Sequence, residues 1–132
     1  MLLVLKTPKQ GVVDITEEVQ QEIARSGVMD GLCALFVQHT SAALFVNEND
    51  EKIPEDLFDV LERLIPEQPA VAYRHADGNA HAHLKASIIG PSLVVPVAKG
   101  RLALGTWQRV LLVEFDGPRQ RNVSVTLINA AS

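Results

Sequence analysis

The 132-residue sequence has little of several residue types, and each shortage excludes a class of protein. Its single cysteine, Cys33, allows neither an intramolecular disulfide nor a cysteine-based zinc cluster. Its apolar runs are too short to span a bilayer, and residues 1–6 lack the basic start and cleavage site of a secretory signal. Lys and Arg number 12 against 16 Asp and Glu, and this net charge of −4 disfavours general binding to nucleic acid or anionic lipid. We therefore expect a cytoplasmic protein with neither nucleic-acid nor membrane partners.

The composition that remains is that of a globular protein. Hydrophobic residues make up 47% and charged residues 21% of the chain, close to globular averages. A chain of this length buries roughly two-thirds of its unfolded surface without help from a disulfide or a structural metal. We expect one domain over residues 1–132, in which any metal is functional and Cys33 is a small buried apolar residue.

Hydrophobic patterning predicts short strands around a few helices. The expected strands cover residues 2–6, 12–15, 31–38, 42–46, 93–97, 101–104, 107–115 and 122–128. The expected helices cover residues 16–26, with Thr16 as the N-cap, 54–65 and 82–89. Short turns after residues 6 and 115 predict hairpins, and residues 66–80 form an exposed connection. The predicted fold class is α+β, with an antiparallel β-sandwich-like core and about three helices.

Charge is unevenly distributed along the chain. Acidic residues dominate from Asp14 to Glu67, whereas the later half is basic. Its cations are Lys85, Lys99, Arg101, Arg109, Arg119 and Arg121. A phosphate ligand is expected to bind the later half, with Lys85 and Arg101 as phosphate contacts.

The four histidines fall at loops or at the ends of expected elements. Convergence of His39, His75 and His83 would create an imidazole site for zinc or a similar divalent ion, although a lone histidine is more often solvated or hydrogen-bonded. His81 and His83 share one side of the chain only in an extended backbone. In the expected helix, His81 instead neighbours Lys85, and His83 neighbours Ser87.

Polar side chains follow two expected strands. Residues 38–41, which include His39, Thr40 and Ser41, end a buried strand and favour a cleft. Residues 47–50, beginning with Asn47, offer the oxygen ligands that magnesium or calcium prefers, but helix caps have the same composition.

Residues 100–108 place two glycines around a short expected strand. Their backbone N–H groups and Arg101 are suited to an anion, and Thr106 and Gln108 add polar groups. A hairpin turn anchored by Trp107 explains the same pattern. Thr106 stands where a P-loop requires lysine, and neither a Gly-x-Ser-x-Gly nor a His-Glu-x-x-His motif occurs.

Taken together, several segments resemble the YjbQ family, also called UPF0047, along nearly the whole chain. They are VQHTSAAL (37–44), NEN (47–49), YRH (73–75), HLKASIIG (83–90), SLVVP (92–96), GRLALGTWQ (100–108) and EFDGPR (114–119). The resemblance implies a small α+β homotrimer and an activity named secondary thiamine-phosphate synthase. Many members have Glu-His-Arg where this chain has Glu114-Phe115-Asp116, so a histidine contribution is absent there.

Matching positions give the candidate site residues that the resemblance implies. The catalytic candidates are His39, His83 and Glu114. The substrate-binding candidates are Thr40, Ser41, Asn47, Lys85, Ser87, Arg101, Thr106 and Gln108. The candidate ligands of a divalent zinc or magnesium ion are His39, His75 and His83.

The leading functional hypothesis is a thiamine-phosphate synthase-like transferase. Such an enzyme joins a pyrimidine pyrophosphate to a thiazole phosphate and releases pyrophosphate, and a metal with Lys85 or Arg101 would stabilise the leaving charge. One alternative is a metal-dependent hydrolase or transferase acting on another small phosphorylated metabolite. The other is a non-catalytic trimer that binds such a ligand.

Overall fold

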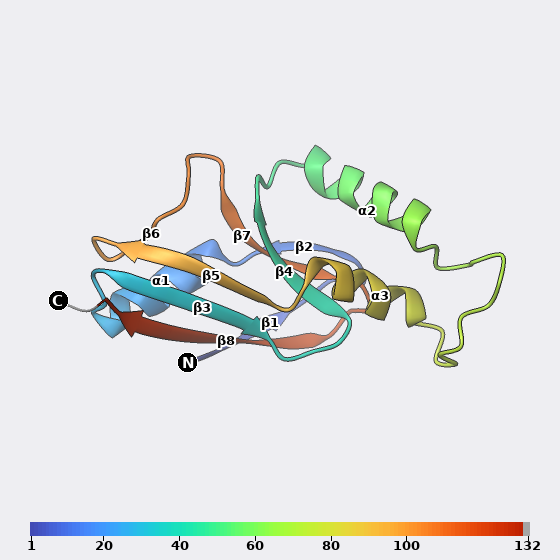
Figure 1. The fold of residues 1–132 in the computed structure, drawn as a ribbon, viewed down its shortest axis with the longest axis horizontal. Coiled ribbons are helices and arrows are strands. Elements are labelled where there is room, and N and C mark those ends of the chain that lie inside the picture. Colours follow the sequence, from blue (N-terminus) through green and yellow to red (C-terminus); the bar gives the residue numbers. More distant parts are fainter. Residues whose placement is uncertain (131–132) are drawn as a thin grey trace.

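The computed structural model describes residues 1–130 and shows two antiparallel sheets with three helices (Figure 1). The strands are β1 (Leu2–Lys6), β2 (Gly11–Asp14), β3 (Gly31–Val37), β4 (Ala42–Asn47), β5 (Ser92–Ala98), β6 (Arg101–Leu102), β7 (Arg109–Glu114) and β8 (Gln120–Asn129). The helices are α1 (Thr16–Ser26), α2 (Lys52–Leu64) and α3 (Ala80–Ile89). The predicted α+β class with an antiparallel core is confirmed.

The larger sheet has the strand order β1-β8-β3-β5-β6, and the smaller has the order β2-β7-β4. In the larger sheet, Cys33 pairs with Leu127 on one side and with Val95 on the other. In the smaller sheet, β7 is central and is buried from Val110 to its end, because it is covered on both faces. This burial explains why β7 reads as a continuous apolar run rather than an alternating one.

The hydrophobic residues form two clusters. The first fills the space between the two sheets and α1, where Val19 and Ile23 of α1 are fully buried. The second joins the smaller sheet to α2 and α3, and includes Leu61 and Phe115. Cys33 belongs to the first cluster, and burial raises the pKa of its thiol to about 11, which is the behaviour of a structural cysteine.

Two predicted hairpins are wrong. The strands β1 and β2 lie in different sheets, and so do β7 and β8. In each pair the chain crosses from one sheet to the other, so that apolar faces of both strands meet across one core. The two crossings are joined where the amide of Thr7 donates to the carbonyl of Arg119 (2.9 Å) and the amide of Gly117 to that of Lys9 (2.8 Å). A Cβ atom at Gly117 would lie 2.0 Å from the carbonyl oxygen of Pro8, so only glycine permits this approach.

The helices begin close to the predicted positions, with different caps. Thr16 is the first residue of α1 rather than its cap, and its amide and hydroxyl both donate to Asp14. Before α2, the carboxylate of Asp50 accepts the amides of Lys52 (3.1 Å) and Ile53 (2.7 Å). Asp50, the last residue of the polar segment 47–50, therefore caps the start of α2. Within residues 1–130, no helix is both long and apolar enough to cross a membrane.

Candidate functional site

The candidate site lies at the N-terminal end of α3. There the helix meets the β3–β4 connection, the loop before α3 and the β7–β8 crossing. Two adjoining cavities share Thr40 and His83. The polar cavity, of about 330 Å³, is lined by Gln38, His39, Thr40, Ser41, Asn79, His83, Asp116, Arg119 and Arg121. The apolar cavity, of about 710 Å³, is lined by Thr40, Val71, Ala72, Tyr73, Arg74, His75, Ala80, His83 and Leu84.

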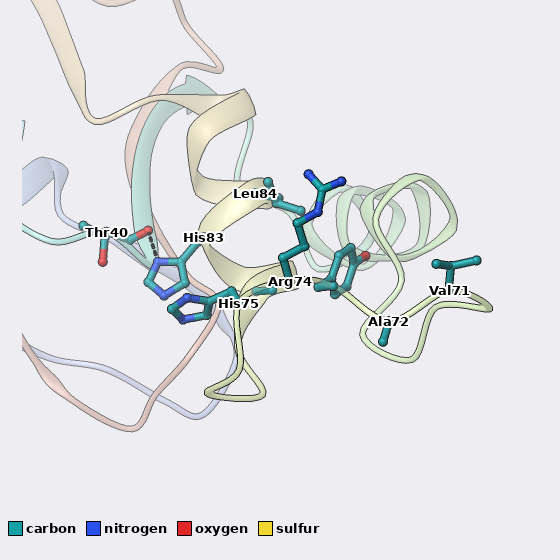
Figure 2. Close-up of a pocket in the computed structure, with 9 residues that line it drawn as sticks. Thr40, Val71, Ala72, Arg74, His75, His83 and Leu84 are labelled. Atoms are coloured by element: carbon teal, nitrogen blue, oxygen red, sulfur yellow. Dashed lines mark hydrogen bonds between the residues drawn. The ribbon is translucent and has the colours of Figure 1, made fainter.

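His83 stands at the junction of the two cavities. Its Nδ1 lies 3.1 Å from the carbonyl oxygen of Thr40. A dashed line marks this hydrogen bond in Figure 2. A carbonyl only accepts, so Nδ1 carries the proton, and the Nε2 atom of the neutral ring has a lone pair available. This is the tautomer that a proton-accepting or metal-ligating histidine requires.

His75 lies beside His83 (Figure 2). Their ring centroids are 5.0 Å apart and their planes are at 81°. Nε2 of His75 is 3.0 Å from the side-chain oxygen of Asn79, whose amide nitrogen donates to Asp116 at 2.8 Å. The bond to Asp116 fixes the orientation of the Asn79 amide, so His75 donates through Nε2. The structure therefore brings two of the three proposed imidazole ligands together.

His39 faces the polar cavity differently. Its Nε2 accepts the backbone N–H of Asn122 at 2.8 Å, which occupies the lone pair that a metal would need. Burial and the nearby Arg121 both lower the pKa of His39, so its imidazole is neutral near pH 7. Within residues 1–130, no group of three or more His, Cys, Asp or Glu side chains is arranged to hold a metal ion.

A buried ion pair lies beneath the polar cavity. Arg121 is only 3% exposed, and its Nε donates to Glu114 at 2.8 Å while its Nη2 bonds both Glu114 and the Ser41 hydroxyl. Glu114 is fully buried and also accepts hydrogen bonds from the Thr7 hydroxyl and the Asp116 amide. Burial alone would raise the pKa of Glu114, but the bonds from Arg121 and Thr7 outweigh it and hold that pKa below its usual range.

A second ion pair lies at the rim of the same cavity. Arg119 bonds the carboxylate of Asp116 at 3.1 Å and its carbonyl at 2.6 Å. Burial alone would raise the pKa of Asp116, but the bonds from Asn79 and Arg119 outweigh it and lower that pKa. Arg119 and Asp116 therefore form a charged pair that also fixes Asn79 and, through it, His75.

Lys85 points away from both cavities. It is 3% exposed, and its ammonium donates to Glu62 of α2 at 2.9 Å and to Nδ1 of His81 at 3.0 Å. The predicted contact between His81 and Lys85 on α3 is confirmed. The predicted neighbour of His83 is also in place, because the Ser87 hydroxyl donates to the His83 carbonyl at 2.8 Å.

The remaining predicted residues lie elsewhere in the fold. Asn47 pairs with Arg109 at the far end of β4, and its side chain accepts the amide of Glu48. Arg101 belongs to β6, at the opposite end of the larger sheet from α3 (Figure 1). Thr106 and Gln108 lie in the loop between β6 and β7, where Gln108 accepts the amide of Gly105 at 2.8 Å. Within residues 1–130 these residues do not meet His83.

Four residues that the sequence did not predict as site residues line the polar cavity. They are Asn79, Asp116, Arg119 and Arg121. For Arg121 a signal exists in the sequence. In the alternating strand β8, it occupies the same face as Val123 and Val125, and this pattern predicts a cation turned inward. Asp116 and Arg119 lie in a turn sequence, and their composition alone does not distinguish them from ordinary turn residues.

Two antiparallel sheets, three helices and a histidine-lined cavity at the start of α3 define a class of small α+β proteins. The chain belongs to the family described as UPF0047 protein YjbQ-like, whose model matches residues 2–130.

Relatives match over nearly their whole length. A UPF0047 protein of Archaeoglobus fulgidus is 45% identical over 126 residues, covering 95% of this chain and 98% of the relative. The UPF0047 protein YugU of Bacillus subtilis is 37% identical over 128 residues, covering 96% of each chain. A crystal structure of an uncharacterized conserved YjbQ/UPF0047 protein from Clostridium acetobutylicum superposes with a TM-score of 0.92 at 40% identity, covering 97% of this chain and 99% of that one. The predicted family is confirmed, and these descriptions name no activity.

Proposed function

We propose that the two adjoining cavities bind a small phosphorylated metabolite and that His83 is the catalytic residue. The observation that carries the proposal is the position of His83, whose available Nε2 lies between a polar cavity and an apolar one. A polar cavity with two arginines suits a phosphate group, and an apolar cavity suits an organic ring. The phosphate and the organic part of one ligand would thus lie on opposite sides of His83.

Thiamine-phosphate synthesis is the specific reaction that we propose for this site. A C–N bond forms between the thiazole ring nitrogen and the methylene carbon of the pyrimidine, and the C–O bond to pyrophosphate breaks. Negative charge therefore develops on the leaving pyrophosphate. The arginines would stabilise it by hydrogen bonding, and Nε2 of His83 would pass it a proton while Nδ1 stays bonded to Thr40. The nucleophile loses no proton in this reaction.

Hydrolysis of another small phosphate ester is the second candidate. It is favoured by the tautomer of His83, because a neutral imidazole with Nδ1 bonded to Thr40 can accept a proton from water through Nε2. In that reaction a P–O bond forms to the water oxygen, the ester P–O bond breaks, and the leaving alcohol oxygen receives the proton that His83 accepted. The third candidate function is binding of a phosphorylated ligand without catalysis.

The side chains at the site determine whether one chain can hold the proposed divalent metal. His75 and His83 supply two imidazoles, one fewer than the three protein ligands usual in a catalytic zinc site, while Nε2 of His39 is engaged with Asn122. The residues of one protomer therefore do not fit a resident zinc ion, and we derive no step through it. Magnesium carried by a pyrophosphate substrate requires few protein ligands and remains compatible with the site.

An assay with pyrimidine pyrophosphate, thiazole phosphate and magnesium tests the proposal. Thiamine phosphate and pyrophosphate should appear together, and His83→Ala should lower turnover by about 100-fold or more. Arg63→Ala on the exposed side of α2 is the matched control. Product equal to a blank without enzyme would exclude the synthase, and a panel of phosphate monoesters then tests hydrolysis. Binding without turnover would support the third candidate.

A homotrimer is the assembly that we propose. The outer face of the larger sheet carries exposed apolar side chains at alternating positions, including Leu32, Phe36, Val94 and Ile128, and a second copy would cover them. Light scattering should give three times 14.4 kDa. Val94→Lys, which places a charge in this face, should lower the mass towards one protomer. A wild-type mass of one protomer would contradict the proposal.

A further inference from the structure

We infer that Arg121 is the receptor for the phosphate group and that Glu114 is the residue that positions it. The inference rests on the proposed function only in taking the bound anion to be the phosphate of a metabolite. Lys85 and Arg101, the phosphate contacts expected from the sequence, do not line the polar cavity. It follows from which guanidinium nitrogens are occupied and which face the cavity.

The guanidinium of Arg121 is buried but not saturated. Its Nε and Nη2 donate to Glu114 and Ser41, whereas Nη1 has no hydrogen-bond partner among residues 1–130. Among residues 1–130, the fully enclosed side-chain polar atom without a partner is an oxygen of Glu22, so Nη1 of Arg121 retains some accessible surface. Arg121 also lines the polar cavity. The small accessible part of this 3% exposed side chain therefore includes Nη1, and we infer that its two N–H groups are available as donors at the cavity wall.

The surroundings of Nη1 suit a tetrahedral oxyanion. Arg119 lines the same cavity, and the amides of the first turn of α3 begin beside it at Asn79. Neutral His39 adds its Nδ1–H as a further donor, because its Nε2 accepts from Asn122. A phosphate has enough acceptor oxygens to bond several of these donors at once.

Directed donors rather than excess charge would give this site its affinity. The charge of Arg121 is balanced by Glu114, and that of Arg119 by Asp116. A guanidinium already held by a bidentate carboxylate loses little conformational freedom when it binds a second anion. The pairing also keeps the arginine stable in a buried position while the cavity is empty of ligand.

Glu114 acts through Arg121 and does not touch the ligand. It is fully buried, it does not line either cavity, and both its carboxylate oxygens accept hydrogen bonds from the protein. These contacts fix the plane of the guanidinium and so aim Nη1. Lys85 is not the phosphate receptor, because its ammonium is bonded to Glu62 and His81 outside the cavity.

Binding of inorganic phosphate and of pyrophosphate to the wild-type protein is the first experiment. In a nitrogen-detected NMR titration, the guanidinium signals of Arg121 and the first-turn amides of α3 should shift in a saturable manner. Thiazole phosphate should perturb the same signals, because the shared phosphate group is what the site recognises. Saturable binding that leaves the Arg121 signals in place would overturn the inference.

Variants supply the second experiment. The double substitution Arg121→Met with Glu114→Leu replaces the buried pair by apolar side chains, an exchange that buried pairs often tolerate. It should weaken pyrophosphate binding at least ~10-fold, the effect expected for a lost charge-assisted hydrogen bond. Arg63→Ala is the control and should bind as wild type does. A folded double variant with wild-type affinity would overturn the inference, and the wild-type titration decides it if the variant does not fold.

Glu114→Gln tests the positioning role separately. It keeps the shape of the side chain but removes the charge that holds Arg121, so the Arg121 Nε signal should move and pyrophosphate should bind a few-fold more weakly. Unchanged affinity together with an unchanged Nε signal would contradict that role. Loss of turnover with intact pyrophosphate binding would count against the proposed reaction and not against the phosphate receptor.

Discussion

His81 and His83 differ by two positions in the same helix and have opposite surroundings. His81 is 4% exposed and lies between α3 and α2, where its Nδ1 accepts from Lys85. His83 is partly exposed and lies at the junction of the two cavities, where its Nδ1 donates to Thr40. Two positions along a helix are about 200° apart around its axis, so one residue type serves two opposite faces.

The difference shows how a helix can be fixed on one face and leave the other available for chemistry. On the buried face, Lys85 joins α3 to Glu62 of α2, and Glu62 also accepts the amide of Glu67. That face therefore holds the start of the loop that lines the apolar cavity. On the cavity face, the His83 ring makes one hydrogen bond among the described residues, through Nδ1, and keeps Nε2 available.

A substitution on the buried face of α3 should have the largest effect on stability. Lys85→Ala leaves Nδ1 of His81 buried without a donor and removes the packed Lys85 stem, so the free energy of unfolding should fall by about 2–3 kcal/mol. Solvent screens the Glu62 side chain, which is 50% exposed, so the ion pair itself adds little to this loss. Urea unfolding measures the loss. Arg63→Ala should stay within about 0.5 kcal/mol. A Lys85→Ala protein as stable as this control would show that the pair contributes no stability.

Acidification should lower the free energy of unfolding by a smaller amount, through His81 on the buried face. Burial lowers the pKa of His81, Lys85 lowers it further, and Glu67, Glu62 and Asp116 oppose the shift. The unfolded chain then binds a proton near pH 6.5 before the folded protein does, so stability is complete above that pH and falls as the pH drops through the lowered folded value. The slope for one such group is at most about 1.4 kcal/mol per pH unit.

His81→Gln keeps an acceptor for Lys85 but does not titrate, so its unfolding free energy should depend less on pH between 6.5 and 5. His39, whose pKa burial also lowers, leaves a residual slope in the variant. Glu62, Glu114 and other carboxylates with lowered pKa values lose their contribution only in more acidic solution. Identical slopes for the variant and the wild type would assign the dependence to His39 or to other groups.

Local sequence patterns predicted helix α3, but they did not predict the contacts between different elements at the site. The i, i+4 spacing was sufficient to place His81 beside Lys85, because both residues lie on one helix. The pairing of Arg121 with Glu114 depends on strands of two different sheets, which short turns had indicated to be a hairpin. Turn composition does not encode whether a chain returns along its own sheet or crosses to the next.

The smallest effect is expected on the cavity face, at Ser87. Its hydroxyl is exposed and donates to the carbonyl of His83 within the helix, so it replaces a hydrogen bond to water and orders no other element. Ser87→Ala should therefore change the free energy of unfolding by less than about 0.5 kcal/mol, with alanine's higher helix propensity offsetting the lost bond. Urea unfolding beside Lys85→Ala makes the two faces directly comparable. A loss at Ser87 as large as that at Lys85 would mean that the cavity face is as firmly fixed as the buried face, and that the division of α3 into a structural and a chemical face does not hold.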